Sequence, residues 1–188
     1  MVQTIEMSHA TTRVLRIAGW SLAVLFIAFN VIASQFETGA NWGKEDVVFA
    51  AVVFGVVGGV LELAARASTS LSYRIAAAVG VGAGLLLLWV NAAVGLVGSD
   101  DNPANGDYLV VLVAAIAGAV VAWGNPRLLF RAMLGAGAAH LLIAALHLRY
   151  GFEAAAINAF FVALWAVSAL LFRRAAKERE TAARVTQS

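Results

Sequence analysis

Six apolar runs divide the chain, and each has the pattern of one membrane-spanning helix. They lie at residues 14–34, 47–65, 73–97, 108–123, 128–148 and 154–172. A helix needs about 20 mostly apolar residues to cross a bilayer, with a range of about 17–25. The fourth run is shorter, which fits an upright helix or a locally thinned bilayer. The pattern predicts an all-α, six-helix transmembrane bundle at residues 13–174, with tails at residues 1–12 and 175–188.

The composition agrees with a membrane protein. Hydrophobic residues make up 62% of the chain and charged residues 13%, against about 45–50% and about 25% in soluble domains. The net charge of +2 comes mostly from arginines that flank the apolar runs, so we expect contact with the lipid bilayer and no nucleic-acid partner. The chain has no cysteine, which excludes a disulfide framework, thiolate catalysis and cysteine metal sites.

Basic residues fall almost entirely on one side of this six-span arrangement. Eleven of the 13 Lys and Arg residues share that side, namely Arg13, Arg16, Arg66, Arg74, Arg127, Arg131, Arg173, Arg174, Lys177, Arg179 and Arg184. Lys44 and Arg149 fall on the other, where the loops at 35–46, 98–107 and 149–153 hold seven of the 11 acids. Loops rich in Lys and Arg stay cytoplasmic. The asymmetry therefore predicts that both termini are cytoplasmic.

Glu62 is an ionisable residue inside the second run, four residues before Arg66. Ionisable groups in spanning helices are costly and commonly functional. Two interpretations remain open. The favoured one is an ion pair on one helix face, with both side chains reaching toward the membrane interface. The other is a proton or cation site.

His140 and His147 lie seven residues apart and therefore share one face of the fifth run. Together with Asn30, Asn91 and Asn158 they are candidates for a polar patch in the outer half of the bundle. Neutral imidazoles can ligate a metal or haem, or relay a proton, whereas buried polar groups more commonly bond between helices. Because the two histidines are about 10 Å apart along the helix axis, we expect interhelical hydrogen bonds without a metal or cofactor.

Pairs of small residues spaced four apart occur in three of the runs. These pairs are Gly55–Gly59, Gly80–Gly84 and Gly135–Ala139. Such pairs let helix backbones approach closely. They predict close packing within the bundle, or association with a second copy or with another membrane protein.

The loop after the third run contains Asp100, Asp101, Asn102 and Asn105. Asp and Asn at this position are typical caps for the first turn of the next helix and favour its positive dipole end. We therefore expect these residues to cap the fourth span.

The stretch W-V-N-A-A-V-G-L-V-G-S-D-D-N-P-A-N at residues 89–105 resembles a motif of a family of small, uncharacterised bacterial inner-membrane proteins, W-V-N-x-A-V-G-x-x-G-S-E-D-N-P-A-N. Residues 62–66 are similar to a Y-E-L-A-x-R element of the same family. Leu61 departs from its Tyr and Asp100 from its Glu. The resemblance implies a bacterial inner-membrane location and no particular activity or cofactor. It points to Glu62, Arg66, Asn91 and the loop at 100–105.

No nucleophile–base pair, metal cluster or phosphate-binding loop is recognisable in the sequence, so we expect no enzymatic activity. The first functional hypothesis is a structural or accessory subunit that packs against membrane partners. The alternative is a transporter or channel for a small solute or cation, using Glu62 or the His140, Asn91 and Asn158 cluster. A membrane enzyme is the third hypothesis. A water-filled cavity that reaches Glu62 or His140 would favour transport, and a dry bundle would favour the accessory role.

Overall fold

The structure, a computed structural model, describes residues 9–36 and 42–187, and its regular elements in these ranges are all helical. The α-helices are α1 (His9–Ala33), α2 (Lys44–Ala67), α3 (Leu71–Ala93), α4 (Tyr108–Val121), α5 (Pro126–Leu146) and α6 (Phe152–Thr186). Two short 3-10 helices, η1 (Pro103–Asp107) and η2 (Leu148–Tyr150), precede α4 and α6. Six helices, with η1 and α4 counted as one, are long and apolar enough to cross a membrane. The predicted number and order of apolar helices is confirmed.

The boundary of the third helix differs from the prediction. α3 ends at Ala93, four residues before the predicted end of the third run. Gly95 follows with φ 75°, a left-handed conformation that ends helices because only glycine adopts it without strain. Its N–H donates to the Val90 carbonyl at 3.0 Å. Leu96 and Val97 are therefore buried in a turn instead of in the helix.

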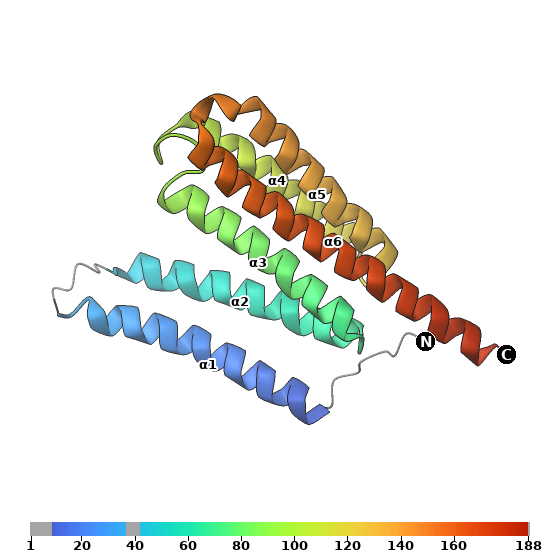
Figure 1. Ribbon diagram of the computed structural model, residues 1–188. Helices are drawn as coiled ribbons and strands as arrows, with labels where there is room; N and C mark the ends of the chain where they lie inside the picture. The colour runs from blue at the N-terminus through green and yellow to red at the C-terminus, as the bar shows by residue number, and fades with distance from the viewer. Residues whose placement is uncertain (1–8, 37–41, 188) are drawn as a thin grey trace.

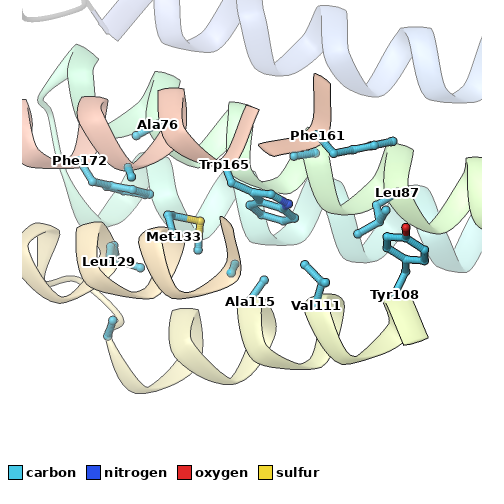
Figure 2. Packing of buried hydrophobic residues seen from close by; sticks show 14 of the residues in the cluster. Ala76, Leu87, Tyr108, Val111, Ala115, Leu129, Met133, Phe161, Trp165 and Phe172 are labelled. Atoms are coloured by element: carbon cyan, nitrogen blue, oxygen red, sulfur yellow. The ribbon is translucent and has the colours of Figure 1, made fainter. Parts of the chain in front are cut away.

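The helices α3, α4, α5 and α6 form a four-helix bundle that holds most of the buried residues, with α6 packed against both α3 and α5 (Figure 1). Figure 2 shows Phe161 and Trp165 of α6 packed among side chains of the other helices. At Gly80 of α3 an added Cβ would lie 2.9 Å from the Ser168 hydroxyl. That hydroxyl donates to the Ala76 carbonyl at 2.8 Å, so the small residues of α3 serve packing inside the bundle.

The helices α1 and α2 form a hairpin beside α3 (Figure 1). No residue in the apolar window of α1 is buried, and Ala50 and Ala64 are the buried residues of α2. The hairpin is held by aromatic packing, with Phe26 set edge-on against Phe54 at 5.5 Å. The helices α1 and α2 therefore contact the bundle much less than the four bundle helices contact one another.

The bundle has two ends, a loop end and a terminal end. The loop end comprises residues 94–107 and 147–151, and the terminal end comprises residues 67–72, 122–127 and 173–187. The last residues of α6 and the first residues of α1 both lie toward the terminal end (Figure 1).

Helices extend into both of the predicted tails. α1 begins at His9, within the predicted tail at residues 1–12. α6 continues to Thr186, through the predicted tail at residues 175–188. Ala175, Ala176 and Glu178 are buried there, so the first turns beyond the apolar run still pack against the bundle.

Candidate functional site

At the loop end, the turn after α3 is organised around the buried Asn105 side chain. Its Oδ1 accepts hydrogen bonds from the backbone N–H groups of Leu96 at 2.8 Å and Val97 at 3.0 Å. Its Nδ2 donates to the Ser99 carbonyl at 2.8 Å. Because Asn105 is only 4% exposed, these bonds pair backbone groups that would otherwise be buried without partners.

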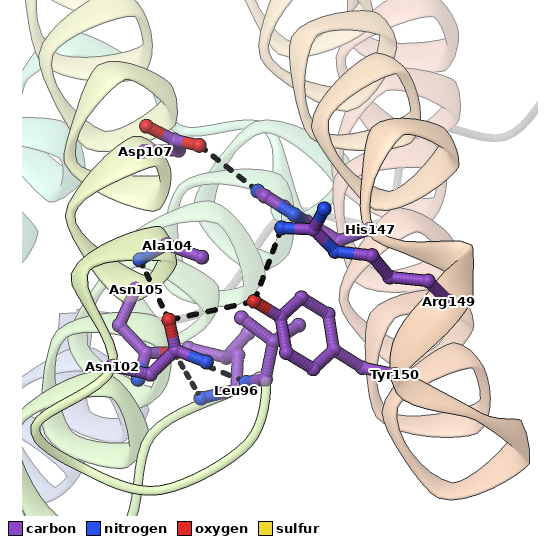
Figure 3. A network of polar contacts seen from close by, with 9 residues as sticks. Leu96, Asn102, Ala104, Asn105, Asp107, His147, Arg149 and Tyr150 are labelled. Atoms are coloured by element: carbon purple, nitrogen blue, oxygen red, sulfur yellow. Dashed lines mark hydrogen bonds and ion pairs between the residues drawn. The ribbon is translucent and has the colours of Figure 1, made fainter.

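Asn102 caps η1 and connects the turn to η2. Its Oδ1 accepts from the Ala104 N–H at 3.0 Å, and the Tyr150 hydroxyl lies 3.5 Å from the same oxygen (Figure 3). Asn102 therefore caps η1, the short helix before α4, whereas the sequence predicted a cap on the fourth span itself. Asp101 is exposed and accepts from the Ser99 hydroxyl, and Asp100 is exposed as well.

Asp107 precedes α4 but does not cap it with its side chain. Its Oδ2 instead lies 2.9 Å from Nε2 of His147 (Figure 3). The Asp107 side chain is 57% exposed, whereas that of His147 is 9% exposed. The pair joins the start of α4 to the end of α5 and sits at the surface of the loop end.

Deeper in the bundle, His140 of α5 bonds to Asn158 of α6. Nε2 of His140 lies 2.9 Å from Oδ1 of Asn158, and Nδ2 of Asn158 donates to the Ala154 carbonyl at 2.8 Å. Both residues are buried, with His140 fully inaccessible. This contact is an interhelical hydrogen bond of the kind expected from the sequence.

The two histidines are linked through Tyr108, the first residue of α4. The Tyr108 ring centroid lies 5.3 Å from that of His140 and 6.0 Å from that of His147. On its other side the His140 ring stacks on Phe161 at 5.6 Å. Asp107, His147, Tyr108, His140 and Asn158 thus form one polar track from the loop end into the bundle.

Asn91 was predicted to join this patch and is not linked to it. Its side-chain oxygen is buried and has no hydrogen-bond partner within residues 9–36 and 42–187. The polar site is therefore built by α4, α5 and α6, without a bonded contribution from α3.

Glu62 and Arg66 form the predicted pair, with Nε of Arg66 3.0 Å from Oε1 of Glu62. A second partner was not anticipated, because Nε of Arg16 on α1 lies 2.5 Å from Oε2 of the same carboxylate. The Glu62 side chain is 16% exposed. The carboxylate therefore connects α1 to α2 near the terminal end, whereas the polar track begins at the loop end.

The small-residue pairs divide into packed and open ones. An added Cβ at Gly84 would contact Leu112 and Trp165 within 4 Å, as expected for a helix interface. At Gly55 and Gly59 of α2, an added Cβ would meet no such neighbour within 4 Å. Gly135 on α5 is likewise open, while Ala139 packs against the core.

Four site residues were missed by the sequence reasoning. Arg16, Asp107 and Tyr108 carry no local signal, because their partners are brought close only by helix packing. Glu178 sits in the predicted tail, yet it accepts hydrogen bonds from the hydroxyls of Ser70 and Ser72, each at 2.8 Å. A helical repeat of small or apolar positions at Ser168, Ala169, Phe172, Ala175 and Ala176 was available as a signal that the buried face of α6 continues this far.

Comparison of the chain with protein-family models, with curated proteins and with solved structures found no match. The family resemblance of residues 62–66 and 89–105 stays a prediction. In the part of the chain that the structure describes, no three His, Cys, Asp or Glu side chains are grouped so as to hold a metal ion.

Proposed function

We propose that this chain is a multi-pass protein of the bacterial inner membrane with a non-enzymatic accessory role, which binds a transmembrane helix of another membrane protein through one face of α2. This α2 face consists of Val48, Val52, Gly55, Val56, Gly59 and Leu63. The terminal end is cytoplasmic in this proposal, as the charge asymmetry indicates.

The observation that carries the proposal is the open space over Gly55 and Gly59, which no side chain or backbone atom within residues 9–36 and 42–187 fills. Val52 and Val56 beside them are 59% and 61% exposed. The open pair lies away from α1, which packs against Gly58 through the Trp20 ring. Among the described residues, this face of α2 is thus left open for a partner helix.

Glycine at these positions has a cost that a partner helix would offset. Each glycine in a helix interior is destabilising by about 0.5–1 kcal/mol relative to alanine. Two glycines spaced four apart allow the backbone of a second helix to approach closely, which strengthens helix–helix packing. They do not strengthen packing against lipid chains in this way. The geometry therefore supports helix association over simple exposure to lipid.

The packing around His140 supports the accessory role over transport. His140 is fully inaccessible and is enclosed by Tyr108, Asn158 and Phe161. A groove of about 220 Å³ between α2 and α3 is lined by residues that include Trp42 and Trp89, and it reaches neither His140 nor Glu62. Neither candidate transport residue is thus connected to this space.

Site-specific photo-crosslinking from α2 tests the proposal. A photoreactive residue at Val56 should form an adduct with a different membrane protein in native membranes. The double variant Gly55→Leu with Gly59→Leu should lose this adduct because two bulky side chains block close approach. Gly135→Leu is the matched control, since Gly135 is also an open helical glycine, and it should keep the adduct.

Two results would count against the proposal. An adduct of twice the mass of the chain would assign the α2 face to self-association. Equal adduct yields from the double variant and from wild type would show that the glycines are not part of an interface.

A further inference from the structure

Cationic side chains gather where α5 and α6 lie side by side near the terminal end (Figure 1). Arg127 and Arg131 are one turn apart on α5, and Arg173 and Lys177 are one turn apart on α6. Nη2 of Arg127 lies 2.6 Å from Oε1 of Glu180, so these turns of the two helices face each other. We call this surface the basic seam, and it consists of Arg127, Phe130, Arg131, Arg173, Lys177 and Glu180.

The basic seam carries charge that the described part of the chain does not neutralise. Arg131, Arg173 and Lys177 are exposed and have no acidic partner within residues 9–36 and 42–187. The Arg173 guanidinium instead lies 6.0 Å from the Phe130 ring centroid. The seam therefore holds four cations and one acid, Glu180.

Most other arginines near this end differ, because groups of the chain already bind them. Five of them form ion pairs or donate hydrogen bonds to described residues, namely Arg16, Arg66, Arg74, Arg174 and Arg179. A preference for basic residues on one side of a membrane explains how often arginine occurs here. It does not explain why the unpaired cations meet at the junction of two helices.

The basic seam continues along both helices into an exposed apolar surface. Leu134 lies three residues after Arg131 and is 47% exposed, and Leu170 lies three residues before Arg173 and is 58% exposed. In the opposite direction, the exposed Trp123 precedes α5, and tryptophan is typical of the headgroup level of a membrane. Cations at headgroup level with leucines on the bilayer side follow the order of a phospholipid, whose phosphate lies outside its acyl chains.

We propose that the basic seam binds one anionic phospholipid of the leaflet at the terminal end. The phosphate accepts charge-assisted hydrogen bonds from the guanidinium groups of Arg131 and Arg173, and Lys177 adds a further positive charge. The acyl chains lie along Leu134 and Leu170. A soluble acidic peptide would pair with the cations but would leave both leucines uncovered, so the surface favours a lipid.

The lipid site rests on the membrane location in the proposed function, and it does not depend on the α2 face. Failure of the crosslink from α2 would leave it unchanged. Because the attraction is electrostatic, each basic residue near the headgroups contributes to the affinity. Removal of one such charge should weaken binding about fivefold, and removal of two should weaken it about 25-fold.

Native mass spectrometry of the purified full chain in detergent tests the site, with phosphatidylglycerol and phosphatidylethanolamine as probes. One phosphatidylglycerol should stay bound at concentrations where phosphatidylethanolamine does not. Arg173→Gln should weaken this binding about fivefold, and Arg131→Gln with Arg173→Gln about 25-fold. Arg173→Lys keeps the charge and should lose less than Arg173→Gln.

Arg13→Gln is the matched control. Arg13 is exposed on α1 and has no acidic partner among the described residues, so its loss removes the same charge away from the basic seam and should leave binding unchanged. Thermal unfolding in the same detergent should show that all variants are folded. Equal binding of the two lipids, equal effects of Arg173→Gln and Arg13→Gln, or displacement of the lipid by excess inorganic phosphate or oligoglutamate would overturn the proposal.

Discussion

Removal of the Glu178 carboxylate is expected to destabilise the terminal end strongly. The side chain is 5% exposed although it lies beyond the apolar part of α6. It accepts hydrogen bonds from Ser70 and Ser72, at the start of α3, each at 2.8 Å. Nε of Arg174 lies 3.1 Å from Oε1. The carboxylate is also favourably placed at the positive dipole end of α3.

The expected loss of unfolding free energy follows from the two hydrogen bonds that Ser70 and Ser72 donate to Glu178. A hydrogen bond to a charged group contributes about 1.5–3 kcal/mol, while the Arg174 pair adds little because that arginine is 57% exposed. Glu178→Ala should therefore lower the free energy of unfolding by about 3 kcal/mol. Glu178→Gln keeps the size and one acceptor oxygen, so its expected cost is about 1–2 kcal/mol.

Reversible unfolding in mixed detergent micelles measures these differences, and Glu180→Ala is the matched control on the same helix. Glu180 is 39% exposed and pairs with Arg127, which is 65% exposed, so its loss should cost about 0–1 kcal/mol. A double-mutant cycle of Glu178→Ala with Ser72→Ala should show a coupling energy of about 0.5–3 kcal/mol. Equal costs at positions 178 and 180, together with zero coupling, would refute the buried contact.

Two further changes have defined outcomes. Gly95→Ala should lower the unfolding free energy more than Gly124→Ala. Both glycines have positive φ, at 75° and 71°, but only at position 95 would the added carbon lie 2.6 Å from Nδ2 of Asn105. Equal losses of unfolding free energy in the same assay would contradict this packing. Glu62→Gln should lower the thermal unfolding temperature, since Arg16 and Arg66 both lose their partner. Addition of Arg66→Gln should restore part of the lost stability. A double variant as unstable as the single one would show that Arg16 alone matters.

The sequence predicts the number and order of the helices because apolar run length is a strong and local signal. It places the end of the third helix too late for a physical reason. Leu96 and Val97 are apolar because they are buried, at 2% and 1% exposure, but they are buried in a turn. Hydropathy reports burial without reporting backbone conformation, and Gly95 alone marks the point where the helix ends.

The candidate site is predictable only where both partners share a helix. Glu62 and Arg66 are four residues apart, so the spacing suffices to predict their contact. Arg16 is on another helix, and Ser72 and Glu178 are separated by 106 residues. Those contacts depend on which helices pack together and on their rotation, which no local pattern specifies. His140 is similar, because its shared face with His147 is evident but its partner Asn158 is not.

Single-cysteine labelling tests the central claim, a six-span protein with both termini cytoplasmic, most directly. The cysteine-free chain accepts one probe at Asp101→Cys at the loop end and another at Ala182→Cys near the end of α6, both at exposed positions. In intact cells an impermeant thiol reagent should label position 101 and should reach position 182 only after the membrane is permeabilised. Labelling of position 182 but not of position 101 in intact cells would contradict the account.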